Sequence, residues 1–126
     1  MRSVYFRVPG EPVAKERPRT FTDGTGKTRT ITPRKTQQAE QMIGYEFRRQ
    51  YPGFGEPIPH PVSVRLVFHT MSKAKDADNL TKTCLDALQG VVFANDRQVD
   101  EIWAKVIRGK GAPETIIEVS WREEAA

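Results

Sequence analysis

Two aspartates that stand two positions apart are the residues of this sequence best suited to chemistry. Asp76 and Asp78 precede a predicted helix, and in extended chain residues two apart point the same way, so both carboxylates can converge on one point. Close carboxylates repel each other unless a cation neutralises them. Carboxylate oxygens suit Mg²⁺ or Mn²⁺, with water and phosphate oxygens completing the shell. The pair is therefore a candidate divalent-metal site.

Three further charged residues are placed to serve the same site. Lys82 lies one helical turn after Asp78, near enough to contact the carboxylates or a bound phosphate. Asp86 lies one turn beyond Lys82, and we expect it to support that lysine rather than to bind metal. Asp96 comes after the helix, where we expect the chain to return toward the helix N-terminus and to bring a third carboxylate.

Each of these residues also has an ordinary structural role open to it. Asp78 is a good helix N-cap, Asp76 is typical of a turn, and Asp86 with Lys82 is typical of a surface ion pair. An EF-hand calcium loop is excluded, because Thr81 stands where that loop requires glycine and its last position carries no glutamate. Structural and metal-binding interpretations both stay open on spacing alone.

The length and composition of the chain limit the classes of protein to which it can belong. It has 126 residues with a net charge of +4, which predicts one domain spanning residues 1–126. A single cysteine (Cys84) and two histidines exclude a disulfide framework and an ordinary four-ligand zinc site. No apolar run approaches the ~20 residues of a membrane span, and Met1–Gly10 lacks the apolar core of a secretory signal. We therefore expect a protein of the reducing cytoplasm.

Positive charge is concentrated in the first half of the chain. Residues 1–52 hold eleven Lys/Arg against five Asp/Glu, whereas residues 53–126 hold nine against eleven. Seven of the cations fall within residues 15–35, called the basic segment below. A basic segment beside an acidic half suggests a polyanion binder with a separate carboxylate site, although a solvated basic loop would look the same.

Alternation of apolar and polar residues predicts four strands. The clearest is Pro61–Thr70, in which apolar side chains alternate with the outward-facing Ser63, Arg65 and His69. The other predicted strands are Ser3–Val8, Ile102–Arg108 and Thr115–Arg122. Within residues 17–32, two Thr/Arg-rich arms flank a glycine-rich turn, which indicates a polar β-hairpin or a flexible loop.

Helical spacing predicts two main helices. The first runs from Thr32 as N-cap, with Pro33 at its first position, to about Gln50, and buries a stripe of three residues: Met42, Ile43 and Phe47. The second spans about Asn79–Gln89, with Asp78 as N-cap, Gly90 just past its end and an apolar stripe of Leu80, Cys84, Leu85 and Leu88. A helical turn is expected at Asp96–Asp100. This order predicts a single small α+β domain, a mixed β-sheet with two main helices packed on it.

The stretch from Asp76 to Val99 also resembles a known family. Three runs resemble the RusA family, the Holliday-junction resolvases of phages and prophages: Asp76-Ala77-Asp78-Asn79-Leu80-Thr81-Lys82, Leu85-Asp86-Ala87-Leu88 and Gly90-Val91-Val92-Phe93-Ala94-Asn95-Asp96-Arg97-Gln98-Val99. More loosely, Lys15–Arg19 and Thr32–Thr36 resemble the basic segment that leads into the first helix of many members. The resemblance therefore covers most of the chain and implies a RusA-like fold.

The resemblance implies a specific activity and site. It implies a homodimer that binds four-way DNA junctions and cuts paired strands with Mg²⁺, for which Mn²⁺ is a plausible substitute. By position, Asp76, Asp78 and Asp96 correspond to the metal-binding catalytic aspartates and Lys82 to the catalytic lysine. Asn95 departs from the usual Asp-Asp pair, but the second position, which carries the catalytic role, is retained as Asp96.

Cations outside the carboxylate site are candidates for contacts with DNA phosphates. The DNA-binding residues we expect are Lys15, Arg17, Arg19, Lys27, Arg29, Arg34, Lys35, Lys73, Lys75 and Lys110, with Lys105 and Arg108 as further contributors. Two other functions remain open: a DNA-junction-binding protein that does not cleave, and a metal-binding regulatory module whose basic segment binds a protein. The intact aspartates and Lys82 argue against a decayed nuclease.

Overall fold

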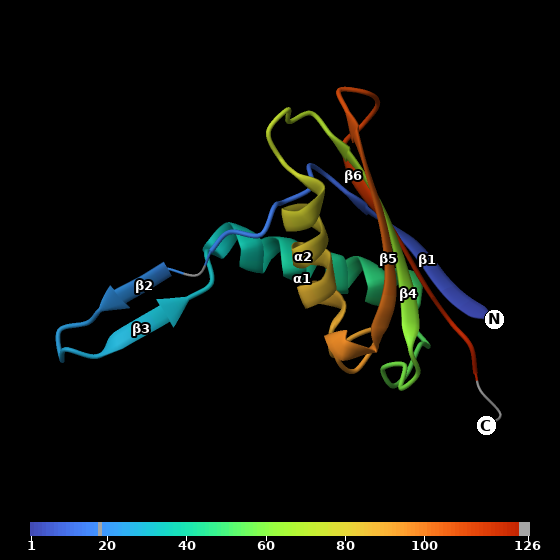
Figure 1. Cartoon of the computed structure of the whole chain (residues 1–126), viewed down its shortest axis with the longest axis horizontal. Helices are drawn as coiled ribbons and strands as arrows, with labels where there is room; N and C mark the ends of the chain where they lie inside the picture. The colour runs from blue at the N-terminus through green and yellow to red at the C-terminus, as the bar shows by residue number, and fades with distance from the viewer. Residues whose placement is uncertain (18, 124–126) are drawn as a thin grey trace.

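A four-stranded sheet with two helices on one face forms the body of the protein, and a separate hairpin projects from it (Figure 1). The computed structural model describes residues 1–17 and 19–123. The elements, in chain order, are β1 (Arg2–Pro9), β2 (Arg19–Thr22), β3 (Thr28–Ile31), α1 (Arg34–Gln50), β4 (Val62–Thr70), α2 (Ala77–Leu88), the 3₁₀ turn η1 (Asp96–Gln98), β5 (Val99–Arg108) and β6 (Glu114–Trp121).

The sheet is mixed, as the sequence predicts. Its strand order is β1-β6-β4-β5, with β4 and β5 parallel and the other neighbours antiparallel. Helix α2 connects the parallel pair, so it descends along the sheet between the end of β4 and the start of β5. The expected single α+β domain is confirmed. None of the described helices is both long enough and apolar enough to cross a membrane.

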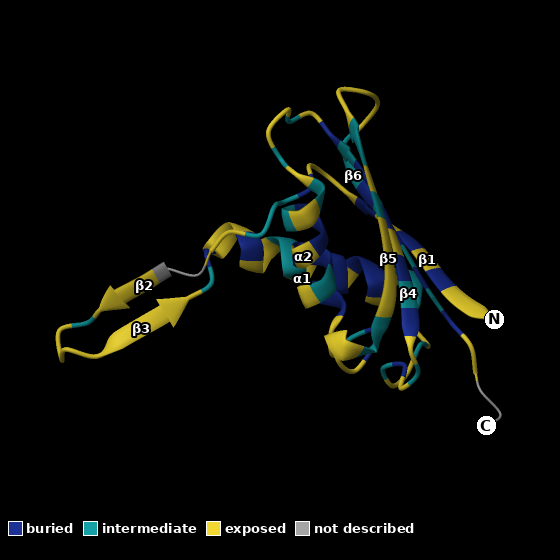
Figure 2. Ribbon diagram, viewed as in Figure 1, coloured by how far each residue is buried: buried dark blue, intermediate teal, exposed yellow. Residues whose placement is uncertain are grey.

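The core lies between the sheet and the helices (Figure 2). Strand β4 shows why: Val62, Val64, Leu66 and Phe68 are buried, and they alternate with residues that face the open side of the sheet. The predicted inward set of this strand is confirmed. Helix α1 closes the core by packing the Phe47 ring against neighbouring aromatic rings, including that of Phe54 at a centroid distance of 4.9 Å.

The basic segment contains a β-hairpin, so the first of the two sequence interpretations is confirmed. Strands β2 and β3 form their own two-stranded sheet, which Figure 1 shows extending away from the body. Asp23 organises the turn, accepting hydrogen bonds from the backbone N–H of Thr25 at 2.9 Å and of Lys27 at 3.1 Å. Bonds from the Thr25 hydroxyl and the Arg29 guanidinium help to lower the pKa of Asp23 to about 2.

Several local predictions were wrong. Pro33, rather than Thr32, occupies the N-cap position of α1, and no side chain caps this helix. Met42 is 46% exposed, whereas Ile43 and Phe47 are buried as expected, because the helix presents a narrower stripe to the sheet than the sequence suggests. The helical turn expected at Asp96–Asp100 covers only η1, since β5 begins three residues before the predicted strand.

Candidate active site

Asp76 caps the N-terminus of α2. This residue is extended (φ −99°, ψ 156°), and its Oδ1 accepts a hydrogen bond from the backbone N–H of Asn79 at 2.8 Å. The side-chain amide of Asn79 adds a longer contact of 3.3 Å to Oδ2. Asp76 is therefore the N-cap, and the prediction that Asp78 fills this role was wrong by two residues.

Asp78 lies inside the first helical turn and points into solvent. Its side chain is 77% exposed, and its Oδ2 lies 3.3 Å from Nζ of Lys82, one turn along. Because Asp78 is helical, the extended-chain argument for a shared direction with Asp76 does not hold here. Both residues nevertheless belong to the N-terminal end of α2, where the helix dipole favours negative charge.

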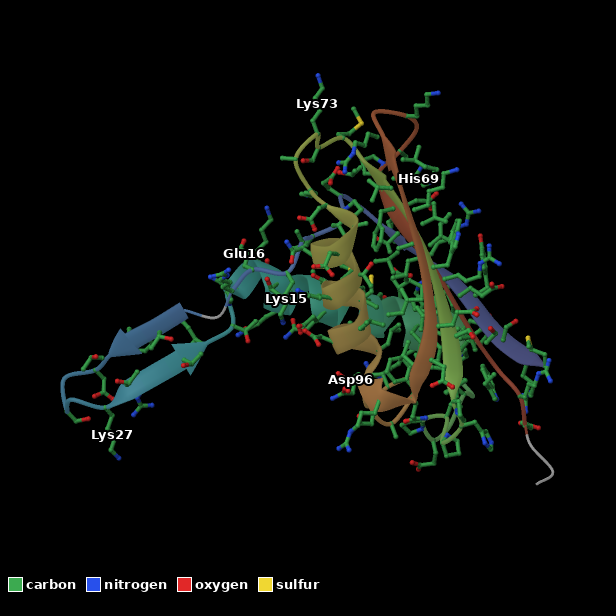
Figure 3. The ribbon with its side chains drawn as sticks, in the orientation of Figure 1. Lys15, Glu16, Lys27, His69, Lys73 and Asp96 are labelled. Carbon is green, nitrogen blue, oxygen red and sulfur yellow. The ribbon has the colours of Figure 1, made fainter. Side chains whose placement is uncertain are left out.

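Asp96 lies at the other end of α2 (Figure 3). Its backbone N–H donates to Oε1 of Gln89, the residue that ends the helix, at 3.0 Å. A helix of 12 residues is about 18 Å long at 1.5 Å per residue, so Asp96 is far from Asp76 within one chain. The expectation that the chain returns toward the helix N-terminus was wrong.

One chain therefore places two of the three aspartates at the α2 N-terminus and the third at the other end of the helix. Among the described residues, no three His, Cys, Asp or Glu side chains form a cluster that could hold a metal ion. The oxygen donors of Asp76 and Asp78 have the right chemistry for Mg²⁺, since carboxylates and water are its usual ligands. Asp96 does not join Asp76 and Asp78 within one chain.

Gln98 fixes the position of Asp96, and sequence reasoning missed it as a positioning residue. Its side-chain amide donates to the carbonyls of Ile58 at 2.7 Å and His60 at 2.8 Å. Its Oε1 accepts from the backbone N–H of Asn95 at 2.7 Å, completing a capping box around η1. The available signal was its place in the run that resembles the RusA family.

Lys15 joins the start of the basic segment to both helices (Figure 3). Its Nζ lies 2.9 Å from Oδ2 of Asp86 on α2 and 3.6 Å from Oε2 of Glu40 on α1. Partial burial works against the charged form, but the hydrogen bond and charge of Asp86 outweigh it and raise the pKa of Lys15. The expected pairing of Asp86 with Lys82 was wrong, because each has a different partner.

A second ion pair fixes the loop that leads into Asp76. Nζ of Lys75 donates to Glu11 at 2.9 Å and to the carbonyl of Pro12 at 2.6 Å. Burial opposes ionisation of Glu11, yet hydrogen bonds from the Thr70 hydroxyl, the Met71 N–H and Lys75 lower its pKa overall. Glu11 carried no signal in the sequence that would link it to a residue 64 positions away.

The DNA-binding candidates divide by whether an acidic partner already compensates their charge. Lys15 and Lys75 are paired as described, and Arg29 pairs with Asp23 at 2.7 Å. Within the described part of the chain, the exposed candidates without a carboxylate at ion-pair distance are Arg17, Lys27, Arg34, Lys35, Lys73 and Lys110, and the same is true of Lys105 and Arg108. Arg19 begins β2, and its side chain lies outside the described part.

Cys84 takes no part in the site. It is buried in the core, and burial raises the pKa of its thiol to about 12, so it is neither a thiolate nucleophile nor a metal ligand at neutral pH.

Most of the chain matches a known protein family. The sequence model of the family described as Endodeoxyribonuclease RusA matches residues 9–120. No curated protein matches the chain. The matched range includes the basic segment, both helices and all four candidate site residues.

Proposed function

This chain belongs to the RusA family of endodeoxyribonucleases, and we propose that it resolves four-way (Holliday) DNA junctions by Mg²⁺-dependent cuts made as a homodimer. The observation that carries the proposal is the α2 N-terminus, where Asp76 and Asp78 lie with Lys82 inside the range matched by the family. The role of the protein would then be in DNA recombination and repair.

Each residue has a role that fits its surroundings. Asp76, Asp78 and Asp96 would hold Mg²⁺ through carboxylate oxygens; the bound ion would polarise the scissile phosphate and lower the pKa of a water ligand. Lys82 is 57% exposed and adjoins Asp78, so its ammonium can reach a phosphate beside the carboxylates. There it would stabilise negative charge that develops during cleavage.

Dimerisation is part of the proposal because one chain separates its aspartates. Asp96 lies beside Gln89 at the far end of α2 from Asp76, so the three carboxylates can meet only if Asp96 comes from a second copy. A two-fold dimer places each Asp96 in the other subunit's site and gives two equivalent sites, which suits a reaction that cuts paired strands.

The substrate class follows from the exposed cations. The hairpin and the loops around the α2 N-terminus carry lysines and arginines that no described carboxylate compensates, including Lys27, Lys73 and Lys110. Such residues bind phosphates without reading sequence. They would hold DNA near a site whose own net charge is negative.

Cleavage of a synthetic four-way junction, with and without Mg²⁺, tests the proposal. We expect metal-dependent paired cuts by the wild type and none by Asp78→Asn. Asp86→Asn is the matched control: it removes a carboxylate from the same helix, but that carboxylate pairs with Lys15 and not with Lys82. Binding without cleavage by the wild type would favour the junction-binding protein that does not cleave, and absence of junction binding would contradict the proposal altogether.

A further inference from the structure

The hairpin formed by β2 and β3 has two different faces. Phe21 lies opposite Arg29, and Thr20 lies opposite Thr30. Opposed residues of antiparallel strands share a face, and successive residues along a strand point to opposite faces. One face, called the Phe21 face below, therefore carries Phe21, Arg29 and Ile31. The other face carries four threonines: Thr20, Thr22, Thr28 and Thr30.

Two large apolar residues of the Phe21 face lie outside the core of the protein. Phe21 is 45% exposed and Ile31 is 49% exposed, and neither belongs to the hydrophobic core or to the described residues that pack against it. The hairpin extends away from the body (Figure 1), and both of its strands are exposed (Figure 2). A two-stranded hairpin is at best marginally stable by itself in water. This apolar surface is therefore free to contact a partner of the hairpin.

The charges around the hairpin select a negatively charged partner. Lys27, next to the hairpin turn (Figure 3), has no described carboxylate at ion-pair distance, and the same is true of Arg34 just after β3. Asp23 is the only acidic residue in the sequence between positions 17 and 35. Its charge is already compensated by Arg29 at 2.7 Å. The hairpin therefore presents uncompensated positive charge beside an apolar surface.

A polyanion that also offers flat apolar rings fits this combination. Aromatic side chains stack on the faces of nucleobases, and such stacking tolerates any base sequence because every base has a π face. In an intact duplex the base faces are covered by their neighbours, and only the base edges are reached through the grooves. Base faces become accessible where strands part or arms meet. Branched DNA therefore offers phosphates to the cations and a base face to the aromatic ring.

We propose that Phe21 stacks on a nucleobase exposed at the branch point of a DNA substrate, with Ile31 against the adjoining sugar and Lys27 on a flanking phosphate. The inference rests on the proposed function, to which it adds a residue that distinguishes branched DNA from duplex DNA. Phosphate contacts alone cannot make that distinction, because a duplex carries the same phosphates. Phe21 is thus a specificity-determining residue that lies outside the carboxylate site.

Binding titrations without metal test the stacking contact. Phe21→Ala should raise the Kd for a synthetic four-way junction by at least about fivefold and leave the Kd for a duplex of the same length close to the wild-type value. Phe21→Leu, which keeps apolar volume without a ring, should also weaken junction binding, whereas Phe21→Tyr should bind like the wild type. Tyr45→Leu is the matched control, because it removes an aromatic ring that is 58% exposed on α1.

Photocrosslinking tests the place of the contact on the DNA. A 5-iodouracil base next to the branch point, irradiated in the metal-free complex, should crosslink to Phe21, as identified by mass spectrometry of the digested product. The same base in the middle of an arm should give no crosslink to this residue. Phe21→Leu should lose the branch-point crosslink. Because Phe21 is exposed and outside the core, the variants should fold, and thermal unfolding of each preparation checks this.

The outcomes separate this inference from the proposed function. Junction binding by Phe21→Ala or Phe21→Leu as tight as that of the wild type, an equal loss of duplex affinity, or crosslinking to Phe21 only from the arm would overturn the stacking contact. If the wild type still cuts junctions in those cases, the proposed function stands without it. Selective loss of junction binding together with the branch-point crosslink, but no metal-dependent cleavage by the wild type, would overturn the proposed function and leave the stacking contact intact. A wild type that binds no branched DNA would overturn both.

Discussion

Asp76 caps α2 and, under the proposed function, also binds the metal, and substitution can separate these two roles. Its Oδ1 caps α2 through the 2.8 Å bond from the Asn79 N–H, while its charge is assigned to metal binding. Asparagine caps a helix about as well as aspartate, because its side-chain oxygen accepts the same bond, but it lacks the charge. Alanine removes both.

The expected magnitudes follow from the cap. Loss of an N-cap oxygen destabilises a protein by about 1 kcal/mol, so Asp76→Ala should lower Tm by roughly 3–5 °C in a chain of this size. Asp76→Asn should leave Tm within about 1 °C of the wild type. Both variants should lose cleavage by more than about a hundredfold, since even residues outside the first ligand shell of a metal site typically change activity by 10–100-fold.

Thermal unfolding and junction cleavage, measured on the same preparations, check these expectations. Asp78→Ala is the control: it removes an equally placed charge that caps nothing, so it should change stability by no more than about 0.5 kcal/mol while abolishing cleavage. If Asp76→Asn lowered Tm as much as Asp76→Ala, the capping assignment would be refuted. Wild-type cleavage by Asp76→Asn would refute the catalytic one.

Other residues give further tests. Lys15→Met should reduce stability by about 1–2 kcal/mol, because Oε2 of Glu40 is buried without a hydrogen-bond partner and then faces no cation. The pKa of Lys15 is raised above its usual 10.5, so this contribution is fully present below that pH and is lost as pH rises through the raised value; urea midpoints of wild type and variant should therefore converge at high pH. Asp86→Asn should leave the Mg²⁺ concentration for half-maximal cleavage nearly unchanged, and a large rise would count against its pairing role. Replacing Arg17, Arg19 and Arg29 of the basic segment with alanine should weaken binding by a similar factor for junctions of different sequence. The salt slope of log K should fall by about two, because Arg29 is already paired with Asp23. An unchanged slope would mean that DNA is held elsewhere. Tyr51→Phe should lower the free energy of unfolding in urea by about 1 kcal/mol, because it removes the hydroxyl that bonds the backbone of Tyr5 in β1. An unchanged value would show that these two hydrogen bonds do not stabilise the protein.

Sequence patterns predicted the elements of the fold well because their signals are local. The alternation in β4 decided which face is buried, and Gly90 marked the end of α2 through a positive φ of 80° that favours glycine. Cap positions were less predictable. Asp76 and Asp78 are both good N-caps, and the choice depends on which backbone N–H groups the helix leaves unpaired, a matter of one or two residues in the chain path.

The site was harder to predict than the elements because its geometry depends on long-range contacts. Asp96 lies where Gln98 binds the carbonyls of Ile58 and His60, about forty residues earlier, and nothing local signals that contact. Asp86 has an ideally spaced neighbour in Lys82, yet it pairs with Lys15 because the chain before β2 crosses α2. Short-range ion-pair rules failed here since a distant partner was better placed.

The pairing of cations explains how a protein with a negative site can bind a polyanion. The lysines nearest the fold's joints, Lys15 and Lys75, are partly buried against carboxylates, where their charge stabilises the attachment of the basic segment and of the loop before α2. Lys73 (Figure 3) lies instead on the loop between β4 and α2, and Lys110 lies on the loop between β5 and β6. Both lysines are exposed, and the two loops lie at the same end of the sheet (Figure 1). Under the proposed function, phosphates bound by those loops would come close to Asp76 and Asp78, whose repulsion of DNA only a bound cation would relieve. Without metal, replacing either aspartate by asparagine should therefore tighten junction binding, and with saturating Mg²⁺ that gain should disappear. A variant that bound no tighter than the wild type in the absence of metal would show that DNA does not pass over the α2 N-terminus.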